Sequence, residues 1–146
     1  MSQQVDPPPL SIAPPGPVRV AGLSVGAQAL GMVAFAAATV VSGARNRAPI
    51  GELLAQGGYF VVLAVFVAAV AAALLRGRRW GRTPALVLEI IVTGIGFYLA
   101  VPSGQPAAGL AVMLVGIGTG YLLLSRPANQ WIGSFPPMFG PDSPDD

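Results

Sequence analysis

The sequence predicts an all-α, polytopic membrane protein in which four transmembrane helices form an up-down bundle between disordered, proline-rich tails. Charged residues make up only 10% of the 146-residue chain and hydrophobic residues 53%, which is more apolar than a soluble globular domain. The apolar residues gather in four long stretches, and a helix needs about 20 such residues to cross the hydrocarbon core. The predicted spans are residues 20–44, 57–75, 84–101 and 107–124.

Helices are favoured over a membrane β-barrel, because barrel strands alternate apolar and polar residues whereas residues 59–75 are continuously apolar and rich in alanine. Glu52 and Gln56 are interpreted as the amphipathic start of the second helix. Pro84 suits the first turn of the third helix, and Pro106 precedes the fourth. The first stretch is too long for the apolar part of a cleaved signal peptide, which has about 7 to 15 residues.

The segments on either side of this domain, which we place at residues 19–126, are predicted to be tails. Residues 1–18 contain six prolines, which lack a backbone donor and favour an extended chain. Residues 127–146 are rich in proline and aspartate and end in a short acidic run. We expect both segments to be disordered, and the alternative is that a proline-rich segment docks on a partner.

The arginines predict the orientation, because loops on the cytoplasmic side carry an excess of basic residues. With four spans, the side that holds both termini carries six arginines and the opposite side two. We therefore expect both termini in the cytoplasm and the spans in a bacterial inner membrane. Four of the six precede the third span and could also bind anionic lipid headgroups: Arg76, Arg78, Arg79 and Arg82.

Small residues indicate which helix faces pack together, because helices in lipid associate by close approach more than by hydrophobic burial. Such residues recur at helical spacing in all four spans. The predicted packing positions are Gly22, Gly26, Ala64, Ala68, Ala72, Gly96, Gly116 and Gly120. They predict a compact bundle and leave open whether some of these faces meet another subunit.

Glu89 is the only acidic residue within the predicted spans. A charged side chain at the centre of a bilayer costs at least about 2.5 to 3.5 kcal/mol, so this carboxyl must be protonated, hydrogen-bonded or in contact with water. Thr93 lies on the same helix face, and Gln28 and Tyr121 lie at a similar predicted depth. These four residues form the candidate intramembrane polar site, whose two interpretations are an interhelical hydrogen bond and a proton or cation carrier.

Several functional classes are disfavoured by composition. The chain has no cysteine and no histidine, which removes thiolate nucleophiles, imidazole bases and the commonest zinc and haem ligands. We therefore predict no enzyme activity, metal or cofactor. The net charge is only +2 and the arginines lie at helix ends, so no nucleic-acid partner is expected. All eight basic residues are arginine, a bias that suggests a GC-rich bacterial genome.

The sequence Arg-Arg-Trp-Gly-Arg-Thr-Pro-Ala at residues 78–85 resembles the loop before the third helix in small four-helix membrane proteins of actinobacteria. Residues 19–22, Arg-Val-Ala-Gly, and Gln28 further along also resemble this family, which is largely without an assigned activity. The resemblance covers roughly residues 19–132. It implies an accessory role, since proteins of this general type can be subunits of the actinobacterial respiratory bc–oxidase supercomplex. Where we expect glutamine in relatives, this chain has Glu89.

We therefore predict a non-enzymatic accessory or scaffold subunit of a larger membrane complex, with membrane lipids and other membrane subunits, or a second copy, as partners. The alternative is a small ion- or proton-coupled transporter built around Glu89. Small multidrug exporters also have four helices and a membrane carboxylate, but theirs lies in the first span, where this chain has Gln28. The few inward-facing polar groups favour the accessory role.

Overall fold

The computed structural model describes residues 11–136, and this part of the chain is built from helices. Four of them are long and apolar enough to cross a membrane: α1 (Gly16–Arg45), α2 (Ile50–Leu75), α3 (Arg82–Ala100) and α4 (Pro106–Leu124). A 3-10 turn, η1 (Arg79–Gly81), precedes α3, and a short helix, α5 (Arg126–Gly133), follows α4. The predicted all-α fold of a multi-pass membrane protein is confirmed. The outer parts of the predicted tails, 1–10 and 137–146, lie outside the described residues.

Prolines mark the starts of the helices, where a missing backbone N–H costs little. Pro17 lies in the first turn of α1 and Pro106 in the first turn of α4. Pro49 directly precedes α2, which begins at Ile50 rather than at the predicted residue 57. The polar residues Glu52 and Gln56 therefore lie within the first turns of α2, as their interpretation as its amphipathic start predicted.

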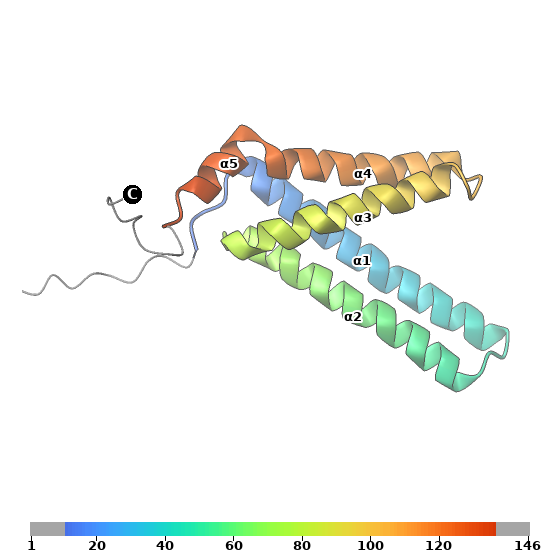
Figure 1. The fold of residues 1–146 in the computed structure, drawn as a ribbon. Helices are drawn as coiled ribbons and strands as arrows, with labels where there is room; N and C mark the ends of the chain where they lie inside the picture. Colours follow the sequence, from blue (N-terminus) through green and yellow to red (C-terminus); the bar gives the residue numbers. More distant parts are fainter. Residues whose placement is uncertain (1–10, 137–146) are drawn as a thin grey trace, which may run out of the picture.

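The four long helices form two antiparallel hairpins, α1 with α2 and α3 with α4 (Figure 1). The connection at residues 76–81 and helix α5 lie at one end of the molecule, which we call the α5 end. The turns at 46–49 and 101–105 lie at the opposite end, which we call the loop end. The hairpins meet near the α5 end and diverge toward the loop end, so the bundle is open at the loop end.

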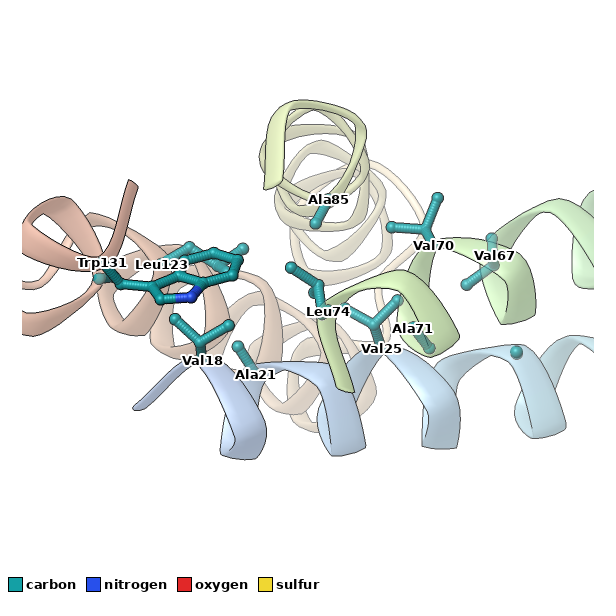
Figure 2. Close-up of a cluster of buried hydrophobic side chains, with 12 residues drawn as sticks. Val18, Ala21, Val25, Val67, Val70, Ala71, Leu74, Ala85, Leu123 and Trp131 are labelled. Carbon is teal, nitrogen blue, oxygen red and sulfur yellow. The ribbon is translucent and has the colours of Figure 1, made fainter. Parts of the chain in front are cut away.

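The main cluster of buried apolar residues explains this shape, because its members on the long helices lie in the halves of those helices nearer to α5. Figure 2 shows these side chains. Leu74 of α2 is fully buried between the two hairpins, next to Ala85 of α3 and Leu123 of α4. Toward the loop end, each hairpin packs mainly within itself. The core residues are Val18, Ala21, Val25, Ala29, Val67, Val70, Ala71, Leu74, Ala85, Leu123, Ala128 and Trp131.

Helix α5 occupies residues that we predicted to be a tail. Its eight residues are too few to give a membrane-length apolar run, and isolated helices of this length are marginal in water. Tertiary packing stabilises it instead. Ala128 and Trp131 are buried in the core, and the Trp131 Nε1–H donates a hydrogen bond to the carbonyl of Ile12 at 3.0 Å.

The segment before α1 is also held in place, although we predicted that residues 1–18 would be disordered. The amide of Ile12 donates to the carbonyl of Gly77 at 3.1 Å. Gly77 has φ +69°, in the left-handed region that favours glycine. A Cβ there would lie 2.8 Å from the Ile12 carbonyl carbon and closer still to its oxygen, so this contact requires glycine.

Candidate functional site

Glu89 lies where the two hairpins meet, on the face of α3 that packs against α1 and α4. Only 2% of its surface is exposed. The Gln28 Nε2–H of α1 donates a hydrogen bond to Glu89 Oε1 at 2.9 Å. The structure therefore brings together the sole acidic residue of the predicted spans and one of the two partners that the sequence suggested.

The second carboxyl oxygen of Glu89 has a different environment. Oε2 is buried and has no hydrogen-bond partner within residues 11–136. A buried carboxyl oxygen without a partner loses its bonds to water and gains none in return, which costs about 1 to 3 kcal/mol and more if the group is charged.

A pair of hydroxyls lies on α1 and α4, the two helices that contact Glu89. Ser24 of α1 and Thr119 of α4 are joined by a hydrogen bond of 2.7 Å between their side-chain oxygens. Ser24 lies one helical turn from Gln28 on the same face of α1. Thr119 precedes Gly120, where an added Cβ would lie 3.9 Å from the Glu89 Cβ. The polar cluster thus consists of Ser24, Gln28, Glu89 and Thr119 and joins three helices.

Thr93 belongs to the same region but does not contact the carboxyl group. Its hydroxyl donates to the backbone carbonyl of Glu89 at 2.7 Å, the usual i to i−4 bond of a threonine within a helix. Tyr121 is not part of the site, contrary to our expectation, because 74% of its surface is exposed. It lies two residues from Thr119, and two residues are about 200° around a helix.

Helices α3 and α4 approach closely beside the cluster because three glycines lie at their contact. A Cβ at Gly96 would lie 2.6 Å from the backbone nitrogen of Met113. A Cβ at Gly116 would lie 3.0 Å from the carbonyl oxygen of Glu89 and would clash with the Thr93 hydroxyl. Gly109, which the sequence analysis did not select, fits as tightly against Ala100.

Most of the other predicted packing positions lie at helix contacts, and one is exposed. A Cβ added at Gly22 would lie 3.0 Å from the Leu75 side chain, and a Cβ added at Gly26 would make an ordinary contact with Ala71 at 3.8 Å. Ala64 is buried and Ala72 half-buried. Ala68 is exposed, contrary to our expectation, because the buried face of α2 does not follow steps of four from Ala64. The residues on that face are Ala64, Val67, Val70, Ala71, Ala73 and Leu74.

The four arginines before α3 have two kinds of environment. Arg82 is half-buried and donates from Nε to the carbonyl of Leu123 at 3.1 Å, and from its terminal nitrogen to the Asn129 side chain. Arg79 donates to the carbonyl of Pro136 at 3.2 Å and lies over the ring of Phe135.

Arg76 and Arg78, by contrast, are exposed. They are the two members of the set whose surroundings leave room for a lipid headgroup. Arg79 and Arg82 instead join the start of α3 to α5 and the segment after it.

A polar pocket of about 500 Å³ lies in the hairpin of α1 and α2 near the loop end. Its α1 residues Thr39 and Ser42 share one face with Ser24 and Gln28, since the four positions fall within about 60° at 100° per residue. The α2 residues of the pocket include Glu52 and Gln56. The pocket is lined by Ala38, Thr39, Ser42, Gly43, Asn46, Ala48, Glu52, Leu53 and Gln56.

The opposite side of this hairpin is apolar. A groove of about 580 Å³ runs between α1 and α2 there, and small residues on both helices form much of it. It is lined by Val33, Ala36, Ala37, Val40, Val41, Ile50, Leu53, Leu54, Gly57, Gly58 and Val61. No cluster of three or more His, Cys, Asp or Glu side chains occurs among residues 11–136.

Comparisons of this chain with protein-family models, with curated proteins and with solved structures find no match.

Proposed function

We propose that this protein is a non-enzymatic accessory subunit of a larger complex in the bacterial inner membrane, with both termini in the cytoplasm. The observation that supports this role is the open loop end of the bundle. There the hairpin of α1 and α2 stands apart from α3 and α4 (Figure 1), and an apolar groove runs between α1 and α2. A transmembrane helix of a partner subunit would fill that groove.

The chemistry of the groove suits a helix. Gly58 lines it, and an added Cβ there would meet nothing within 4 Å. Ala36 and Ala37 on α1 also line the groove, and their small side chains leave space in it. Small residues allow a second helix to approach closely enough for van der Waals packing, which is the main attraction between helices in lipid.

The orientation and the assembly are supported by the charge distribution and by the resemblance to small actinobacterial membrane proteins. Arg76 and Arg78 are exposed at the α5 end, where cytoplasmic lipid headgroups would lie. A respiratory complex is the candidate assembly, because proteins of the resembled type can serve as its accessory subunits.

Two matched substitutions test the partner. Gly58→Leu adds bulk to the groove at a position where a Cβ meets none of the protein's own atoms, and should abolish co-purification of the partner in mild detergent. Gly94→Leu adds the same bulk to the other hairpin, at a position where an added Cβ also meets nothing, and should leave co-purification intact. Equal recovery of the partner with both variants would refute the proposed docking groove.

A second measurement separates a partner subunit from a second copy. A photo-crosslinking residue at Val33, which lines the groove, should attach to the co-purified subunit. The same residue at Ile90, which is exposed on α3, should not. Crosslinking of position 33 to another copy of this chain would instead indicate that the groove mediates self-association.

The transporter alternative is favoured by one observation, the unpartnered Oε2 of Glu89. If the carboxyl carries a proton, Glu89→Gln should fold and yet abolish pH-dependent flux in liposomes, because an amide cannot ionise. If the carboxyl only forms a hydrogen bond between helices, Glu89→Gln should still fold and associate with the partner subunit. Glu89→Leu should then lose about 0.6 to 2 kcal/mol, the range for interhelical hydrogen bonds in membranes.

A further inference from the structure

We propose that the polar cluster of Ser24, Gln28, Glu89 and Thr119 binds a monovalent metal cation, Na⁺ being the one to test. This site is distinct from the partner groove and does not depend on the accessory role. Three of its side chains offer oxygen atoms near one another at the junction of α1, α3 and α4. The cluster lies where the hairpins meet, so an ion there would join both.

The unpartnered carboxyl oxygen is the first argument for an ion. Glu89 is almost completely buried, Gln28 occupies Oε1, and Oε2 is left without a donor from residues 11–136. Gln28 contributes no charge. An ionised carboxylate at this depth therefore needs a positive charge from outside the side chains that bond it, and a bound cation supplies one.

The neighbouring hydroxyls are the second argument. Ser24 and Thr119 bond each other at 2.7 Å, with either oxygen able to donate, so each retains a lone pair for a metal ion. Ser24 is one turn from Gln28, and Thr119 is adjacent to Gly120, which faces the Glu89 Cβ. These two links place the hydroxyl pair on the turns of α1 and α4 that contact Gln28 and Glu89.

The ligand set indicates a monovalent ion. Hard cations prefer carboxylate, hydroxyl and carbonyl oxygens, and the cluster offers these without sulfur or imidazole. Calcium and magnesium are divalent and are usually held by more than one carboxylate or by several waters, and a divalent ion beside the single carboxylate of Glu89 would leave a net positive charge in the membrane interior. One negative charge is balanced by one monovalent cation.

The test is the thermal stability of the full chain in detergent, measured in sodium chloride and in choline chloride at equal ionic strength and fixed pH. Sodium should raise the melting temperature in a saturable way, and choline, which is too large for the site, should not. Direct binding of radioactive sodium should saturate over the same concentration range. Identical melting in the two salts would overturn the proposal.

Variants of the cluster make the test specific. Glu89→Gln should lose the response to sodium, and Ser24→Ala and Thr119→Val should each raise the half-saturating sodium concentration by about tenfold, equivalent to about 1.4 kcal/mol. Thr39→Val removes a hydroxyl from the same face of α1 away from the cluster and should leave that concentration unchanged. If Glu89→Gln does not fold, the two hydroxyl variants still decide the matter.

Two results would contradict the cation site. One is an unchanged half-saturating concentration in Ser24→Ala and Thr119→Val. The other is a wild-type stability that follows pH but not sodium, since Glu89 would then be neutralised by a proton.

Discussion

Replacement of Gly116 by alanine is the sharpest test of the packing beside Glu89. The added Cβ would lie 3.0 Å from the carbonyl oxygen of Glu89 and the backbone nitrogen of Thr93, and closer still to the Thr93 hydroxyl. Ordinary contacts of this kind are about 3.4 to 4 Å. Two of the three neighbours are backbone atoms, so α3 and α4 must move apart rather than reorient a flexible side chain.

The expected loss follows from overpacking, which costs about 1 to 3 kcal/mol when a well-packed contact gains a methyl group. Gly118→Ala is the matched control on the same helix, because nothing lies within 4 Å of an added Cβ there. That substitution should be neutral or slightly stabilising. The free energies of unfolding of both variants can be measured in detergent micelles with increasing SDS.

A double substitution locates the strain. Thr93→Ala removes the hydroxyl that is closest to the new Cβ, so Gly116→Ala should cost less in a Thr93→Ala background than in the wild type. The coupling between the two sites should be about 0.5 kcal/mol or more. If Gly116→Ala is as stable as Gly118→Ala, the close approach of α3 and α4 is not what holds this hairpin. If the two substitutions are simply additive, the strain comes from the backbone atoms and not from the Thr93 hydroxyl.

Three further predictions concern the α5 end. Gly77→Ala places a Cβ against the Ile12 carbonyl at a left-handed backbone position, so it should cost about 1 to 2 kcal/mol and increase hydrogen exchange at the Ile12 amide; unchanged exchange would contradict this contact. Arg82→Gln removes a charged donor to the Leu123 carbonyl and should lower the free energy of unfolding by about 1 to 2 kcal/mol. An unaltered free energy of unfolding would indicate that Arg82 affects only the orientation of the protein in the membrane. A cysteine at position 3 should be labelled only after cells are opened, and labelling from outside intact cells would reverse the proposed orientation.

The sequence alone determined which segments become membrane helices. Continuous apolar runs such as residues 59–75 leave few alternatives, because a backbone in lipid must satisfy its own hydrogen bonds. Prolines then fixed helix starts, as Pro106 does for α4. The sequence also identified Glu89 as the acidic residue that needs a partner, since no other acid lies within a predicted span.

Only the tertiary structure decided which helix faces meet. Thr119 was not selected from the sequence, yet its hydroxyl bonds Ser24, which is 95 residues away along the chain. Tyr121 and Ala68 were selected and are exposed. Periodicity places residues on a face of a helix but does not say whether that face meets another helix or lipid.

The divergence of the hairpins and the presence of α5 also depended on tertiary contacts. The core at the α5 end includes Leu74, Leu123 and Trp131, which come from three different helices, so no local pattern predicts it. Lipid tails solvate an apolar helix face about as well as another helix does. Membrane helices therefore form from their own sequence, whereas their arrangement depends on the fit of particular side chains, such as the contact of Gly116 with Thr93.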